Sequence, residues 1–93
     1  MTKGDVVRLI SDKTGIVRED IQVIIDSFFE TVKESMRDGH HIEIRGFGTM
    51  KMRERKATTA RNPKTGEKVD IPARIVPTFK FSKNFRDEVT KEI

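Results

Sequence analysis

This 93-residue chain lacks cysteine, tryptophan and tyrosine. Without cysteine, neither a disulfide nor a thiolate zinc site can hold the fold together. The chain also lacks a run of about 18 apolar residues and a signal-peptide core, so we expect a soluble, cytoplasmic protein with no membrane partner. Hydrophobic residues make up 34% of the chain, which is little for a self-sufficient core in one small domain. A second copy of the chain would complete such a core.

Patterns for catalysis and metal binding are missing as well. His40 and His41 are adjacent, so in a strand their rings would point to opposite faces, and no third metal ligand accompanies them. The chain has no glycine-rich phosphate loop with its lysine and no plausible Ser/His/Asp set. The sequence therefore predicts a non-enzymatic protein without cofactor or metal.

Positive charge is concentrated in one part of the chain. Residues 45–86 carry 12 of the 19 Lys/Arg side chains but only 3 of the 15 Asp/Glu, a local net charge of +9 within an overall +4. The remaining residues are net acidic. This asymmetry predicts one anion-binding face, with scattered surface charge as the simpler alternative.

Capping residues and apolar periodicity predict three helices. Thr2 and Asp5 resemble a capping arrangement for a helix over residues 3–14 that ends at Gly15. A second helix ends at Gly39, and Ser82 can cap a third. The stripe of the second helix recurs at three- and four-residue spacing and is formed by Ile21, Ile24, Ile25, Phe28, Val32 and Met36. Phe29 widens this stripe, which predicts that a partner's helix covers Phe28, Phe29 and Val32.

Alternating polar and apolar residues predict strands between the second and third helices. Residues 41–45 alternate before the turn Gly46-Phe47-Gly48, and residues 49–55 alternate after it, which gives a first hairpin. Phe47 is expected to protrude from this turn into the core of the second subunit. Alternation resumes as one strand from Val69 to Ile75. The chain then returns to the sheet over residues 76–81, where Pro77 implies an edge or a bulge.

A basic turn, Arg61-Asn62-Pro63-Lys64-Thr65-Gly66, lies between these strands. Proline fixes its φ and glycine accepts a positive φ, so both suit a turn. The turn has no large apolar side chain to bury. We therefore predict a projecting basic ribbon that grips a polyanion.

These motifs resemble the bacterial HU/integration host factor family. The likeness rests on residues 46–49, 61–66 and 77–80, in the family's order and spacing, and it extends over essentially the whole chain. It implies an α+β fold with a single domain over residues 1–93. That fold is an intertwined dimer with a helical base (1–39), a saddle-shaped antiparallel sheet (40–81) carrying two protruding β-ribbon arms (53–74), and a C-terminal helix (82–93).

The resemblance also implies a function. Proteins of this family are histone-like, and they bend, wrap and compact double-stranded DNA through the minor groove in the bacterial nucleoid. We expect largely sequence-independent binding of the HU type, with site-specific binding of the integration host factor type as the alternative, because the minor groove mainly distinguishes A·T from G·C. Pro63 would intercalate between base pairs, with a plain turn proline as the alternative. A homodimer is expected, a heterodimer is the alternative, and RNA is a secondary candidate partner. Carried over residue by residue, the DNA-binding set is Lys3, Arg53, Arg55, Arg61, Asn62, Pro63, Lys64, Lys80, Lys83 and Arg86, and the dimer contacts are Phe28, Phe29, Val32 and Phe47.

The chain departs from the family's pattern at several positions. Thr58 stands where arginine is common, which removes one arm cation, and Ala60 stands where glycine is common. Val17 replaces the usual Ser/Thr cap of the second helix. Phe81-Ser82 replaces a small residue or proline followed by glycine, which puts the local turn geometry in doubt.

Overall fold

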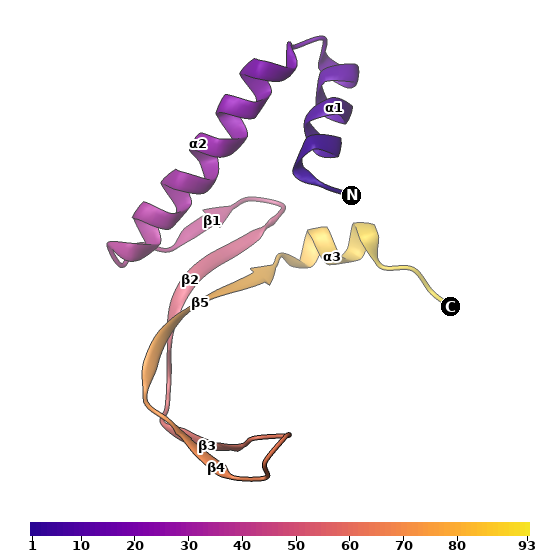
Figure 1. Ribbon diagram of the computed structural model, residues 1–93. Helices are drawn as coiled ribbons and strands as arrows, with labels where there is room; N and C mark the ends of the chain where they lie inside the picture. Colours follow the sequence, from indigo (N-terminus) through magenta and orange to yellow (C-terminus); the bar gives the residue numbers. More distant parts are fainter. The chain divides into compact units, whose positions relative to one another are not determined.

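A computed structural model describes all 93 residues (Figure 1). The chain forms two compact units, residues 1–34 and 35–93. The α+β class is confirmed, whereas the division of one domain into segments 1–39, 40–81 and 82–93 stays a prediction. None of the helices combines the length and the apolar character that crossing a bilayer requires. The elements, in chain order, are α1 (Lys3–Thr14), α2 (Arg18–Arg37), β1 (Ile42–Ile44), β2 (Gly48–Arg55), β3 (Thr58–Arg61), β4 (Lys68–Ile71), β5 (Arg74–Phe81) and α3 (Lys83–Val89).

Helix α1 begins and ends at the residues that its capping signals indicated. The Asp5 backbone N–H donates to Thr2 Oγ1 at 3.3 Å, and the Thr2 backbone N–H donates to Asp5 Oδ2 at 2.8 Å. This reciprocal pair satisfies donors that the first helical turn leaves free. At the other end Gly15 has φ 77° and its N–H donates to the Ser11 carbonyl at 2.8 Å. Both predicted ends are confirmed.

Helix α2 leaves much of its apolar stripe uncovered. Ile21 is buried, but Ile24 is 63% exposed and Phe29 is 51% exposed. The rings of Phe28 and Phe29 meet edge to face, with centroids 5.7 Å apart. One chain therefore leaves part of the stripe uncovered. This agrees with the prediction that the stripe is wider than one short neighbouring helix can cover.

The sheet is three-stranded only near its start. Its order is β1-β2-β5, with both neighbouring pairs antiparallel. Because β1 pairs only with residues 48–50 of β2, the rest of β2 pairs with β5 alone and forms a two-stranded ribbon. Pro77 lies on β5 opposite Met52, at an edge of the sheet, as expected for a residue that cannot donate to a ladder.

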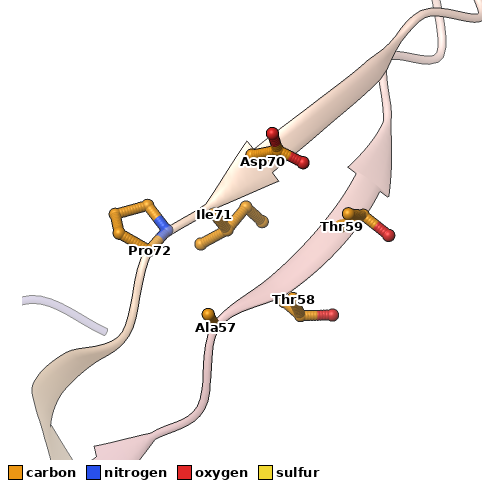
Figure 2. A pocket seen from close by; sticks show the side chains of 6 residues that line it. All are labelled: Ala57, Thr58, Thr59, Asp70, Ile71 and Pro72. Atoms are coloured by element: carbon orange, nitrogen blue, oxygen red, sulfur yellow. The ribbon is translucent and has the colours of Figure 1, made fainter.

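The predicted single strand from Val69 to Ile75 is wrong, because the chain breaks at Pro72-Ala73. Strand β4 ends at Ile71 and β5 begins at Arg74, while the opposite side breaks between Arg55 and Thr58. The alternation of polar and apolar residues continues through the break, so the pattern alone predicts one strand. Pro72 interrupts the strand because it has no N–H to donate to a neighbouring strand. The outer strands β3 and β4 form a separate two-stranded sheet. Figure 2 shows this junction, with Ala57, Thr58 and Thr59 on one side and Asp70, Ile71 and Pro72 on the other.

Four phenylalanines form one cluster where β5 meets α3. Phe47 packs against Phe79 and Phe85, with centroids 5.2 and 5.3 Å apart, so it does not stand free of its own chain. Phe81 stacks on Phe85 at 4.6 Å with the rings nearly parallel. Ser82 caps α3 by accepting the Phe85 N–H at 3.1 Å. The unusual Phe81-Ser82 pair thus forms a regular helix start.

The core of one chain is small. Only Val7, Ile21 and Met36 are buried apolar residues, and no large side chain is completely buried. Phe28, Phe47, Phe79 and Phe81 each keep more than a third of their surface exposed. A soluble monomer rarely exposes so many large apolar groups. The small core therefore agrees with the expectation, drawn from the composition, that a second copy of the chain completes it.

We expect Gly48→Ala to destabilise the fold. A Cβ at this position would lie 2.5 Å from the Lys80 carbonyl oxygen and 2.7 Å from the Phe79 ring. Because the backbone cannot move aside as a flexible side chain would, the free energy of unfolding should fall by about 1–3 kcal/mol, the usual range for overpacking. Urea unfolding measures it.

Gly4→Ala is the matched control. Its added Cβ would come no closer than 3.7 Å to Thr2 Oγ1, and alanine favours a helix over glycine. Equal stability of the Gly48→Ala variant and the wild type would contradict the close approach of β2 and β5.

Candidate nucleic-acid interface

The pairing of β2 with β5 collects cations on one face of the ribbon. Successive side chains of a strand point to opposite faces, and directly paired residues share a face. The pairs Thr49↔Lys80, Lys51↔Thr78, Arg53↔Val76 and Arg55↔Arg74 therefore lie on one side. We call this side the cationic face; within β2 and β5 it holds five Lys/Arg and no Asp or Glu: Lys51, Arg53, Arg55, Arg74 and Lys80. Glu43 of β1 pairs with Thr49 and is the one acidic residue that borders this face.

The opposite face of the ribbon is largely apolar. It carries Met50 opposite Phe79 and Met52 opposite Pro77, and its one acidic residue is Glu54 opposite Ile75. The phenylalanine cluster continues this side toward α3. The ribbon thus has one side for burial and one side for a solvated anion.

Of the five residues on the cationic face, Arg53, Arg55 and Lys80 were predicted as binding residues from the sequence. Lys51 and Arg74 were missed. The alternation of Lys51 with Arg53 and Arg55 could have identified the former, because the three share one side of a strand. Arg74 could be placed only once its partner in β2 was known.

Local hydrogen bonds shape the turn at the end of the ribbon. The Asn62 N–H donates to the Glu67 carbonyl at 2.8 Å, and the Gly66 N–H donates to the Asn62 carbonyl at 2.7 Å, with Gly66 at φ 72°. Asn62 Oδ1 accepts the Lys64 N–H at 2.9 Å, across Pro63. Asn62 therefore holds the turn around Pro63, while Pro63 and Lys64 are themselves exposed.

The outer sheet β3–β4 also has two different sides. Arg61 pairs with Lys68 and Thr59 with Asp70 on one side, whereas Ala60 pairs with Val69 and Thr58 with Ile71 on the other. Arg61 thus lies directly opposite a second cation, and its Nη1 lies 3.5 Å from the Gly66 carbonyl. An open, mostly apolar hollow lies at the junction with the inner ribbon, and Asp70 is its only charged lining residue (Figure 2).

A second group of cations lies where β5 runs into α3. Lys80, Lys83 and Arg86 line one hollow, together with Ser82 and Glu43. Lys83 Nζ lies 3.9 Å from Asp87 Oδ2, and both side chains are largely exposed. Such an exposed pair is worth little, so it leaves Lys83 free to contact another anion. The structure brings together these three predicted residues.

Lys3 lies in the other unit and already has a partner. Its Nζ lies 2.7 Å from Asp26 Oδ1, which joins α1 to α2. This hydrogen bond, with a second from Gln22 to Asp26 Oδ2 at 3.1 Å, holds the pKa of the Asp26 carboxyl below its usual value. Both side chains of the ion pair are about half exposed, so Lys3 can exchange Asp26 for another anion at small cost.

No group of three or more His, Asp or Glu residues is placed to hold a metal ion. The chemistry that the described side chains offer is hydrogen bonding and charge, and it is concentrated on the ribbon. The arrangement suits a long polyanion.

Comparison with known proteins gives matches that extend over nearly the whole chain. A family model described as "Bacterial DNA-binding protein" matches residues 1–90. The chain is 44% identical over 90 residues to integration host factor subunit beta of Marinobacter nauticus, covering 96% of this chain and 92% of that protein. It is 36% identical to DNA-binding protein HU of Clostridium pasteurianum, covering 98% of this chain and all of that one.

Solved structures match the fold of nearly the whole chain. The protein chain of an Anabaena HU–DNA cocrystal structure matches with a TM-score of 0.88 and 37% identity, covering 99% of this chain and all of that one. A HU mutant from Thermotoga maritima matches with a TM-score of 0.72 and 26% identity, covering 97% and 100%.

The Lys3–Asp26 pair gives a prediction about acid. We expect Lys3→Met to raise the pKa of Asp26 toward the value of a free aspartate, because the variant loses the hydrogen bond that contributes most to lowering it. NMR titration of the Asp26 carboxyl measures this. Since the folded-state pKa is the lower one, the pair stabilises the fold above the unfolded-state pKa. That contribution is lost as the pH falls below about 4.

Gln22→Ala is the control, because it removes the weaker hydrogen bond and should raise the pKa of Asp26 less. An unchanged Asp26 titration in Lys3→Met would show that the ion pair does not persist in solution.

Proposed function

The chain belongs to the bacterial DNA-binding protein family, and from this premise we propose that it binds and bends double-stranded DNA as a dimer. The observation that carries the proposal is the cationic face of the ribbon, where β2 and β5 present five Lys/Arg and no acidic residue, with Glu43 of β1 only at its border. The ribbon leads to a tip bearing an exposed proline. Cations on a narrow two-stranded ribbon suit the phosphates and the electronegative floor of the minor groove. The proposed role is architectural and non-enzymatic, in the bacterial nucleoid.

The proposed cationic contacts lie in two places, along the arm and beside the body. Arg53, Arg55, Arg61 and Lys64 bind along the arm, while Lys80, Lys83 and Arg86 bind phosphates beside the body. Lys3 joins them by giving up part of its contact with Asp26. Asn62 acts chiefly by shaping the tip. Most of these groups contact the backbone of the duplex, which carries no sequence information, so we propose binding that is largely independent of sequence.

Pro63 is the proposed wedge. It is exposed at the tip, presents a rigid apolar ring and has no N–H to desolvate. A wedge of this kind inserts between base steps and kinks the duplex, and the cost of unstacking is offset by the contacts that the bend allows. Asn62 supports this role because its hydrogen bond to the Lys64 N–H fixes the chain on both sides of the ring.

The second copy is proposed to cover the exposed phenylalanines. Phe28 and Phe29 on α2 and Phe47 in the cluster are each more than a third exposed in one chain, and Val32 lies on the same stripe. Burying such side chains is the main gain when two small domains associate. Two copies also supply two arms, which allows one dimer to hold a duplex from both sides.

Bending is tested by substituting the wedge and a cation separately. We expect Pro63→Ala to retain most of its affinity for a straight duplex while its bend angle drops sharply, because every cation is still present. Fluorescence transfer between labels at the two duplex ends, measured at saturating protein, reports the bend. An unchanged bend would leave Pro63 as a turn residue only.

Arg61→Ala is the complementary variant. It should flatten the dependence of log K on log salt by somewhat under two units, since each lost phosphate contact contributes about 0.9 and a dimer loses two. At saturation it should still bend DNA. Arg18→Ala, on α2, is the matched control and should change neither quantity. Wild-type protein that binds no duplex at low salt would overturn the proposed function itself.

Dimerisation has its own test. Phe28→Ala or Phe47→Ala should lower the free energy of unfolding by roughly 3–5 kcal/mol, the range for truncating an aromatic that is buried in the assembly. The melting temperature of the wild type should rise with protein concentration, because folding and association are linked. Val23→Ala, which lies outside the apolar stripe and is 64% exposed, should cost little. A wild-type midpoint that is the same over a hundredfold dilution would contradict an obligate dimer.

A further inference from the structure

Two arginines lie opposite each other at the end of the β2–β5 ribbon that leads to β3 and β4. Arg55 is the last residue of β2, Arg74 is the first residue of β5, and the register pairs them directly. Directly opposite residues on an antiparallel pair have their Cβ atoms about 4.5–5.5 Å apart. Both side chains are exposed, so two guanidinium groups share one small patch of the cationic face.

No carboxylate neutralises this pair. The four ion pairs of the chain involve Lys3, Arg8, Lys33 and Lys83, and none reaches either arginine. Glu54 precedes Arg55 but lies on the opposite face of the ribbon, and the other same-face residues nearby are Arg53 and Val76. Like charges directly opposite each other destabilise a strand pair. The free ribbon therefore carries a repulsion that a bound anion would remove.

A phosphate diester fits between two such groups. Each guanidinium offers five N–H donors in a planar fork, and a phosphate accepts hydrogen bonds from several donors at once. The alternative is that solvent alone separates the two charges, as on many protein surfaces. The position of the pair favours an anion, because it ends a run of cations and lies beside the break at Lys56-Ala57 and Pro72-Ala73, where the strands lose their mutual hydrogen bonds.

We propose that Arg55 and Arg74 together bind one backbone phosphate of the duplex. This inference rests on the proposed function and adds Arg74, which no sequence motif indicated, to the binding surface. Bound in this way, the phosphate ties the two strands together at the point where the outer sheet β3–β4 begins. The arm is then fixed at its junction as well as at its tip.

A double-mutant cycle tests whether the phosphate is shared. Arg55→Gln, Arg74→Gln and the double variant are titrated with one fluorescent duplex at 50 and 200 mM salt. A shared phosphate needs both guanidinium groups, so each single variant should lose affinity and flatten the salt slope by up to about two units, one phosphate per arm. The wild type's advantage over either variant should then shrink roughly tenfold between the two salt concentrations. The double variant should lose much less than the product of the two single losses.

Arg18→Gln is the matched control, since it removes an exposed arginine from α2, and it should leave both affinity and slope unchanged. Arg74→Lys is a second variant; it keeps the charge but loses the fork, and it should fall between wild type and Arg74→Gln. The inference is overturned if Arg74→Gln binds as the wild type does. It is also overturned if the double loss equals the product of the single losses, because the arginines then contact separate phosphates.

The same titrations give a different result if the proposed function itself is wrong. In that case the wild-type protein binds no duplex at either salt concentration, and the present inference falls with it. Wild-type binding with an ineffective Arg74→Gln leaves the function standing and removes only the shared phosphate.

Discussion

The antiparallel register between β2 and β5 is the constraint on which the rest of the site depends. Pairing Arg53 with Val76 and Met52 with Pro77 sends every cation of the ribbon to one face and almost every apolar side chain to the other. A slip of one residue would exchange the two faces, burying charge and exposing methionine. The close approach at Gly48, where the Lys80 carbonyl and the Phe79 ring leave no room for a Cβ, helps to exclude that slip.

The second constraint is the shortage of apolar material. A chain that buries only three apolar residues cannot cover its own phenylalanines, and the exposed side of α2 is the clearest sign of this. In the proposed dimer, association serves stability and function together, because the copy that would cover the stripe also brings a second ribbon. Both the fold and the proposed binding surface would then require the second copy of the chain.

The sequence predicted most of the local structure and part of the site. The ends of α1 and the start of α3 were predictable because capping depends on residues three or four apart, as at Thr2, Gly15 and Ser82. The break at Pro72-Ala73 was not, because period-2 alternation continues through it. The Arg55–Arg74 pair and the Lys3–Asp26 bond were also out of reach, since each joins residues far apart whose meeting depends on strand register or helix packing. The stacking of Phe81 on Phe85 depends on how a strand turns into a helix, and residue spacing does not specify this.

The turn that carries Pro63 is built almost entirely from its own residues. The hydrogen bonds that close it run between Asn62, Lys64, Thr65, Gly66 and Glu67, and none reaches the body of the protein. Its shape therefore does not depend on the core of the chain. Such a loop is a modular unit: its own hydrogen bonds set its shape, so a substitution in it changes the tip that the arm presents and leaves the sheet pairing intact.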